Sequence, residues 1–143
     1  MNIEVNTLSK AYASEKIEIN SPVEKVYNLI LNIKEWPKWL SGVTKVYISD
    51  NIQQGTEFVW KAKGYTIKSK IHTLEYNSSI GWTGTMLWLK AIHNWKFESK
   101  SENVTRVAVQ ESFDGFFSSF MANMLKKSMH EDLIKLKMAA ENC

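Results

Sequence analysis

The last part of the chain repeats apolar residues at steps of three and four. The repeat runs from Phe116 to Glu141 and consists of Phe117, Met121, Leu125, Met129, Leu133, Leu136 and Ala140. This spacing places the apolar residues on one stripe of an α-helix, whereas most charged residues of the segment fall off the stripe. No Pro or Gly interrupts the run after Gly115. The pattern therefore predicts one helix about 35–40 Å long, which needs a long apolar partner.

Most of the preceding chain alternates apolar and polar residues with the period of two that is typical of strands. We predict a first strand over 12–19 and six further strands over 43–49, 56–62, 65–75, 80–86, 90–99 and 104–113. Polar or glycine-containing turns separate them, as Lys63-Gly64 does between 56–62 and 65–75. Because these connections are short, the later strands should form an antiparallel meander.

The segment between the first strand and the meander predicts two helical pieces. Ser21-Pro22 is typical of a helix start, with Ser21 able to cap and Pro22 suited to the first helical position. This helix should end near Asn32. Pro37 breaks any continuous helix, so 33–40 should contain a second short helix or turn. The element order β-αα-β6-α predicts an α+β fold, in which a broad curved antiparallel sheet packs against the long C-terminal helix.

Length and composition limit the classes of protein. A chain of 143 residues is expected to form one domain over 1–143, preceded by a loose lead-in over 1–10. The net charge of +3 comes from scattered lysines, which does not favour a nucleic-acid partner. One cysteine, Cys143, excludes a disulfide framework and fits a reducing compartment. No apolar run approaches the ~20 residues of a membrane helix, and the first ten residues lack a signal-peptide pattern. We therefore expect a cytoplasmic protein.

Several short motifs in order resemble one known superfamily. They are INSPVEKVY (19–27), WPKW (36–39), GTEF (55–58), IGWTG (80–84), TRV (105–107) and ESFDG (111–115). Together they resemble the START-related, pollen-allergen-like superfamily (SRPBCC), and within it the polyketide cyclase/dehydrase-like subgroup. The resemblance covers the chain from about Tyr12 onwards and implies the helix-grip fold. The segment 85–90 departs from the family's Gly- or Pro-rich spacer, and Trp88 and Leu89 there are expected to narrow or cover a pocket.

The resemblance implies a function as well as a fold. Members of this superfamily hold apolar molecules, such as lipids or polyketides, in a deep cavity between the sheet and the C-terminal helix. A minority are cyclases, dehydratases or hydrolases, and the family has no single catalytic motif. The resemblance therefore implies binding of a small hydrophobic or amphipathic ligand of lipid, polyketide or aromatic type.

The large apolar residues of the strands gather on one face of each strand. If these faces point inward, the side chains on them line the cavity. The set includes rings that could equally be plain core, and Met residues that adapt to irregular shapes. The predicted ligand-binding residues are Phe58, Trp60, Ile67, Ile71, Trp82, Met86, His93, Trp95, Val109, Glu111, Phe113, Phe117, Met121 and Leu125. Trp36 and Trp39 could equally form a lid over the cavity or belong to the core.

His93 and Glu111 are the polar exceptions on otherwise apolar strand faces. An imidazole and a carboxylate in a cavity can exchange protons, because burial and pairing move pKa values toward neutrality. They are the catalytic candidates of the alternative hypothesis, a cyclase or dehydratase. If they are not catalytic, His93 and Glu111 form a structural hydrogen-bonded pair or hold a ligand in place. A third hypothesis, a protein-interaction module, predicts an exposed apolar patch around Trp36, Trp39 and Trp88.

The other polar residues predict no further chemistry. His72 lies on the lysine-bearing face of its strand and His130 lies among charged residues, so both should be exposed. Three separated histidines and a terminal cysteine make no metal-ligand pattern, and no phosphate-binding glycine motif is present. We expect no metal and no cofactor. The oligomeric state is left open.

Overall fold

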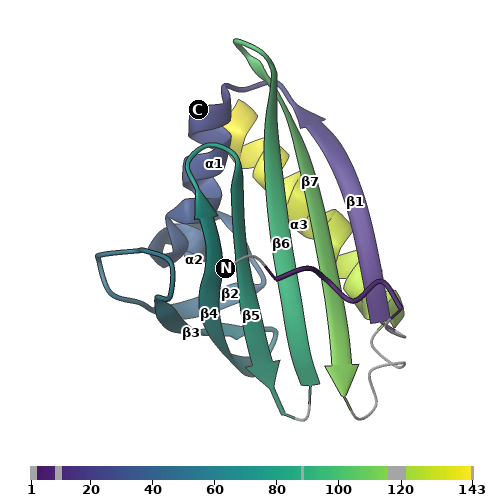
Figure 1. Ribbon diagram of the computed structural model, residues 1–143. Coiled ribbons are helices and arrows are strands. Elements are labelled where there is room, and N and C mark those ends of the chain that lie inside the picture. The colour runs from purple at the N-terminus through teal and green to yellow at the C-terminus, as the bar shows by residue number, and fades with distance from the viewer. Residues whose placement is uncertain (1–2, 9–10, 88, 116–121, 143) are drawn as a thin grey trace.

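A seven-stranded antiparallel sheet curves around the C-terminal helix (Figure 1). The computed structural model describes residues 3–8, 11–87, 89–115 and 122–142. The strands are β1 (Ala11–Ile19), β2 (Val43–Tyr47), β3 (Glu57–Ala62), β4 (Tyr65–Glu75), β5 (Ser79–Met86), β6 (Leu89–Ser101) and β7 (Val104–Gly115). The helices are α1 (Val23–Leu31), the 3-10 turn η1 (Ile33–Glu35), α2 (Trp36–Trp39) and α3 (Ala122–Glu141). The α+β architecture predicted from the sequence is confirmed.

The sheet has the strand order β1-β7-β6-β5-β4-β3-β2. The meander predicted for β2 to β7 is confirmed, since each of these strands pairs antiparallel with its successor. The first strand closes the other edge by pairing with the last, so that Ile17 lies opposite Val107 and Ala13 opposite Glu111. The order of the elements along the chain does not reveal this pairing, because more than eighty residues lie between the end of β1 and the start of β7.

The two helical pieces between β1 and β2 form as the sequence predicts. Pro37 occupies an early position of α2, after η1 has interrupted the path of α1. We had expected the side chain of Ser21 to cap α1, but α1 has no side-chain capping hydrogen bond. Instead Ser21 is buried, and its carbonyl oxygen accepts a hydrogen bond from Thr105 Oγ1 at 2.8 Å. The start of α1 is therefore fixed by its contact with β7.

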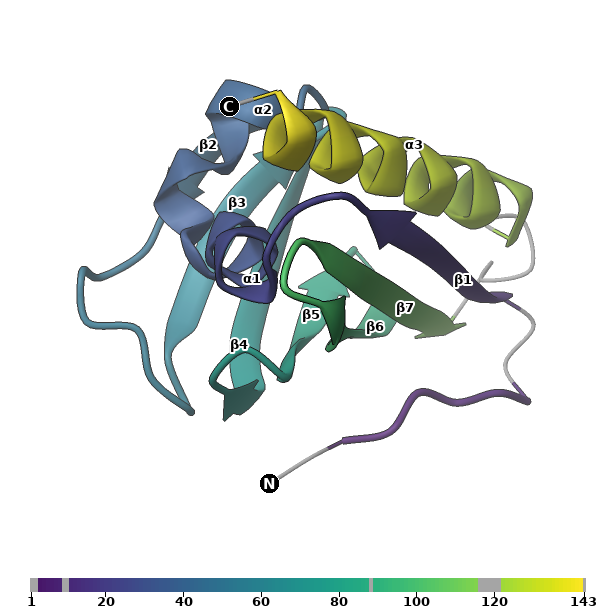
Figure 2. The same cartoon turned by 90° about the horizontal axis from the view of Figure 1, so that it is seen from above.

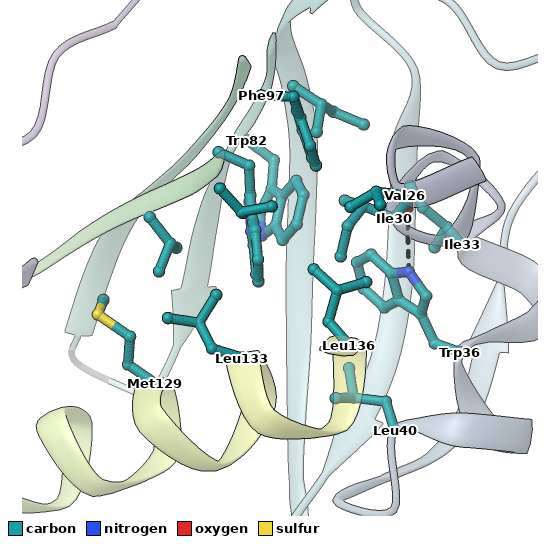
Figure 3. Close-up of a cluster of buried hydrophobic side chains, with 14 of the residues drawn as sticks. Val26, Ile30, Ile33, Trp36, Leu40, Trp82, Phe97, Met129, Leu133 and Leu136 are labelled. Carbon is teal, nitrogen blue, oxygen red and sulfur yellow. Dashed lines mark hydrogen bonds between the residues drawn. The ribbon is translucent and has the colours of Figure 1, made fainter. Parts of the chain in front are cut away.

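Helix α3 covers the inner face of the sheet with the predicted stripe. Leu125, Met129, Leu133, Leu136 and Ala140 are buried, and Figure 3 shows Met129, Leu133 and Leu136 turned from α3 toward the strands. The predicted start of this helix, together with Phe117 and Met121, lies outside the described residues. Polar contacts fasten α3 to the end of β1, where Lys137 Nζ donates to the carbonyl oxygen of Glu18 at 2.9 Å.

The alternation of β4 is broken once, next to His72, whose predicted exposure is wrong because the N-terminal segment covers it. The register of β4 on β5 shifts between Ile71 and Thr73, which is a β-bulge that changes the face of the residues beyond it. His72 is only 8% exposed, although we had expected it to be exposed. Thr73, the residue after His72, lies opposite Gly81. His130, in contrast, is exposed as predicted and pairs with Glu15 at 2.8 Å.

His72 is buried by the N-terminal segment. Residues 3–8 cross the outer face of the sheet, on the side away from α3 (Figure 2). The backbone N–H of Ile3 donates to His72 Nδ1 at 3.2 Å, and Asn94 Nδ2 donates to the carbonyl oxygen of Ile3 at 2.7 Å. Burial lowers the pKa of His72, and a side-chain hydrogen bond to Asn94 partly opposes that effect. We had expected a loose lead-in; its described part has no regular secondary structure, yet it is fixed to the sheet.

We predict that replacing Leu133 with Ala lowers the free energy of unfolding by about 2–5 kcal/mol, because Leu133 is 1% exposed and its loss leaves a cavity in the core. The neighbouring Ile134→Ala change is the matched control, since Ile134 is 38% exposed and should change stability by less than about 1 kcal/mol. Urea unfolding of both variants measures the difference. Equal losses would show that α3 does not bury the stripe described above.

Candidate functional site

A cavity of about 140 Å³ lies beside α3, on the inner face of the sheet. Its walls come from α2, from strands β2 to β7 and from the first half of described α3. The lining is mostly apolar, and much of it is aromatic. Most of the predicted ligand-binding residues line it: Trp60, Ile67, Trp82, Met86, His93, Trp95, Glu111, Phe113 and Leu125. The alternation of the strands therefore brings these side chains to one place, while their role in binding stays a prediction.

Three of the predicted residues that the structure describes do not line this cavity. Phe58, Ile71 and Val109 are buried in the surrounding core and are not part of the cavity wall. Phe117 and Met121 lie outside the described residues. Because Phe58, Ile71 and Val109 lie on inward strand faces, sequence alternation cannot separate them from true wall residues.

Trp36 is the centre of the aromatic wall. Its ring lies 5.3 Å from that of Trp60 and 5.2 Å from that of Trp82, measured between ring centroids. Its indole N–H donates to the carbonyl oxygen of Ile30 at 3.0 Å (Figure 3). Trp36 is 2% exposed, so it belongs to the core as well as to the wall. The exposed patch predicted around Trp36 is therefore not present at this residue.

His93 and Glu111 meet inside the cavity. They lie opposite each other on β6 and β7, and His93 Nδ1 is 3.3 Å from Glu111 Oε2. Their side chains are 12% and 15% exposed, respectively. The imidazole also lies between two indoles, with ring centroids 4.8 Å from Trp82 and 5.4 Å from Trp95. The pair predicted from the sequence is thus assembled at an aromatic wall.

Asp132 is a cavity-lining carboxylate that was not predicted from the sequence. It projects from α3 into the same lining as His93 and Glu111. The pKa of Asp132 is raised to about 6, chiefly by burial and also by the Glu111 carboxylate, while the charge of His93 opposes the rise. A signal was present, because Asp132 follows Leu125 by seven residues and so lies on the same side of the helix. The charge of Asp132 led us to place it off the stripe.

Asp132 has no hydrogen-bond or ion-pair partner among the residues that the structure describes. Two of the tryptophans that line the cavity also have an indole N–H without a hydrogen-bond partner among the described residues. Trp39 Nε1 and Trp95 Nε1 are buried and have no described acceptor, whereas Trp60 Nε1 donates to Ser69 Oγ at 3.0 Å. Buried polar groups are normally satisfied. The cavity wall therefore contains both donors and acceptors that the described chain leaves open.

A cation lies at the rim of the cavity. Lys63, in the exposed β3–β4 turn, contacts Ser128 Oγ of α3 through its Nζ. Both residues belong to the lining, so this contact joins the two sides of the opening. The Lys63 ammonium is among the charges that lower the pKa of Asp132, but burial outweighs them. The half-exposed Met124 and Tyr65 complete the rim.

A larger hollow of about 670 Å³ lies on the outer face, beneath residues 3 and 4. Its walls include the charged side chains of Lys16, Lys96, Glu98 and Arg106. Trp95 lines both hollows, whereas Trp36, Trp60 and Trp82 line the smaller cavity and not the larger hollow. The smaller cavity is the stronger candidate for a binding site, because it combines apolar walls with a few polar groups and one raised pKa.

Within 3–8, 11–87, 89–115 and 122–142, no group of three or more His, Cys, Asp or Glu side chains is arranged to hold a metal ion. Over the same part of the chain, no helix has the length and apolar character needed to cross a membrane.

Comparisons with known proteins place this geometry in context. Residues 10–141 match the family described as polyketide cyclase / dehydrase and lipid transport. No curated protein matches the chain. A hypothetical protein from Helicobacter pylori has a similar structure, with a TM-score of 0.84, 15% sequence identity, and coverage of 99% of this chain and 98% of that one.

Two other solved structures are similar in fold. A START superfamily protein from Mycobacterium smegmatis has a TM-score of 0.73 and 14% identity, with coverage of 92% of this chain and 94% of that one. The Zhui aromatase/cyclase from Streptomyces sp. R1128 has a TM-score of 0.67 and 11% identity, with coverage of 92% and 88%. At these identities the likeness establishes the helix-grip fold alone.

We predict that Asp132→Asn stabilises the protein at neutral pH. The folded-state pKa of about 6 exceeds the ordinary value of 3.8, so the folded state loses stability as the pH rises through this window. Removing the charge should increase the free energy of unfolding on the order of 1–3 kcal/mol at pH 7.5. The gain should vanish below pH of about 4, where Asp132 is protonated in both states. Urea unfolding at pH 7.5, 5.5 and 4.0 measures this, and a gain independent of pH would contradict the buried-charge explanation.

Proposed function

The chain belongs to the polyketide cyclase / dehydrase and lipid transport family, and from this premise we propose that it binds a small apolar or amphipathic molecule in the cavity beside α3. The observation that carries the proposal is the composition of that cavity. Aromatic walls meet a polar end formed by His93, Glu111 and Asp132. Ligand sites characteristically combine apolar walls with a few convergent polar groups.

The size of the cavity favours a compact ligand. A volume of about 140 Å³ is close to that of the dry engineered cavities of ~150 Å³ that bind benzene. Of the lipid, polyketide and aromatic classes that the family resemblance implies, one ring with a short arm fits best. Burying roughly 200 Å² of such a ligand would contribute about 5 kcal/mol before association costs. Binding at micromolar to millimolar concentrations is therefore expected.

We predict that toluene raises the melting temperature of the protein, since a ligand that binds only the folded state stabilises it. Ala62→Leu should abolish this shift, because Ala62 lines the cavity and the larger side chain fills it. Ala108→Leu is the matched control, since Ala108 lines the outer hollow and its replacement should leave the shift intact. The measurement is a thermal scan with and without saturating toluene, alongside native mass spectrometry of the freshly purified protein. No shift with the wild type would count against the proposal.

A second candidate function, acid–base catalysis, is favoured by one observation. His93 and Glu111 lie 3.3 Å apart in a partly buried, aromatic-lined space, which is the geometry in which a carboxylate can take a proton and an imidazole can return one. A ketone bound there would have its α-proton within reach of such a pair. This supports the cyclase or dehydratase hypothesis, with Glu111 as base and His93 as its partner.

The acid–base hypothesis predicts that the protein accelerates exchange of the α-protons of phenylacetone in D₂O. Glu111→Gln should reduce the acceleration by about 100-fold or more, while the toluene shift persists. Glu98→Gln, a change of the same kind at an exposed position of β6, should have no effect. Proton NMR measures the exchange rate. A wild-type rate equal to that of buffer would remove this second candidate and leave the binding proposal standing.

A further inference from the structure

The polar end of the cavity is negatively charged. Two carboxylates, Glu111 and Asp132, line it. Glu111 pairs with His93, while Asp132 has no hydrogen-bond or ion-pair partner in the described part of the chain. Charged groups in a protein interior are normally paired. Of the two carboxylates in the cavity, the described residues therefore provide a partner for Glu111 but none for Asp132.

The nearest cations of the chain do not complete this pairing. Lys63 and Lys135 both lower the pKa of Asp132 through their charge, but neither forms an ion pair with it, and burial remains the largest effect. Lys63 is exposed and its Nζ contacts Ser128 Oγ. Solvent screens charges at such positions, so the interior of the cavity keeps its negative character.

The walls around this charge are aromatic. Trp82 and Trp95 flank His93, and Trp36 lies against Trp82. Indole faces attract cations through the ring quadrupole, and aromatic cages are a recurring means of binding ammonium groups. An apolar wall alone would accept any small hydrophobic molecule. Aromatic faces beside a carboxylate that lacks a partner select for positive charge.

Trp95 adds a second, independent indication that the site is incomplete. It is 4% exposed, and its indole Nε1 has no acceptor among the described residues. A donor on β6 and an acceptor on α3 thus line the same cavity without meeting each other. An ammonium group would complete Asp132 alone, because it donates hydrogen bonds and accepts none, and the Trp95 N–H requires a separate acceptor.

We propose that the cavity is specific for a small amphipathic amine, with the aromatic or alicyclic body against the tryptophans and the ammonium group beside Asp132 and Glu111. This inference rests on the proposed binding function and adds the class of ligand. Asp132 is the specificity-determining residue, since its carboxylate is the one that has no partner within the described chain.

The test compares three probes of similar size: 2-phenylethylamine, 2-phenylethanol and phenylacetate. Titrations followed by tryptophan fluorescence at pH 7.5 should give an affinity for the amine at least tenfold higher than for the alcohol, with phenylacetate weakest. In Asp132→Asn the amine should lose at least tenfold in affinity, while the alcohol changes by less than threefold. Asp50→Asn removes the same charge from an exposed loop and should leave all three affinities unchanged.

The pH dependence provides a second readout. Asp132 faces His93, Glu111, Lys63 and Lys135, and its pKa in the free protein is about 6. Acidification protonates Asp132 and removes its negative charge, so amine affinity should fall as the pH drops from 7.5 to 5. The affinity for 2-phenylethanol should stay within threefold over the same range.

The outcomes separate the two proposals. If toluene binds but the alcohol equals the amine, or if Asp132→Asn leaves their ratio unchanged, the amine inference is wrong and the binding function stands. Preferred binding of phenylacetate would also overturn the inference, because it would show that the indole donors and Lys63 dominate. If neither toluene nor any of the three probes binds, both proposals fail.

Discussion

Burial of the apolar stripe of α3 is the constraint on which the rest of the structure depends. A helix that presents Leu125, Met129, Leu133 and Leu136 on one side needs an apolar surface along its whole length. The sheet provides it by curving (Figure 2), and the pairing of β1 with β7 extends the sheet beneath the helix. The first strand and the last helix are then fastened to each other, as Lys137 and Glu18 illustrate.

The same packing explains why a hollow remains. A curved sheet and a straight helix cannot stay in contact everywhere, so the space on the α2 side of α3 has to be filled by large side chains. Trp36 fills much of it and contacts Trp60 and Trp82. Rigid rings pack less completely than small flexible side chains, and about 140 Å³ is left open. The cavity is thus a consequence of how indoles share the space beneath the helix.

The polar residues of the cavity work against stability. Burial raises the pKa of Asp132, and the indole N–H of Trp95 is buried without a described acceptor. Groups of this kind destabilise a fold unless something completes them. On the opposite face the situation is reversed, because the buried His72 and the partly buried Asn94 hold the backbone of Ile3 through hydrogen bonds. Gly81 makes room for them, since a Cβ there would lie 2.4 Å from Asn94 Oδ1 and 2.7 Å from His72 Cε1.

By itself the sequence determined the element order, the apolar stripe of α3 and the face of each strand, because periods of two and 3.6 residues record which side of an element is buried. The pairing of His93 with Glu111 also follows from alternation once the register is known. The tertiary structure alone decided three other matters. It placed β1 beside β7, it put a bulge at His72 that moved Thr73 to the outer face, and it turned Asp132 into the cavity. These depend on contacts between distant segments, and local patterning carries no record of such contacts.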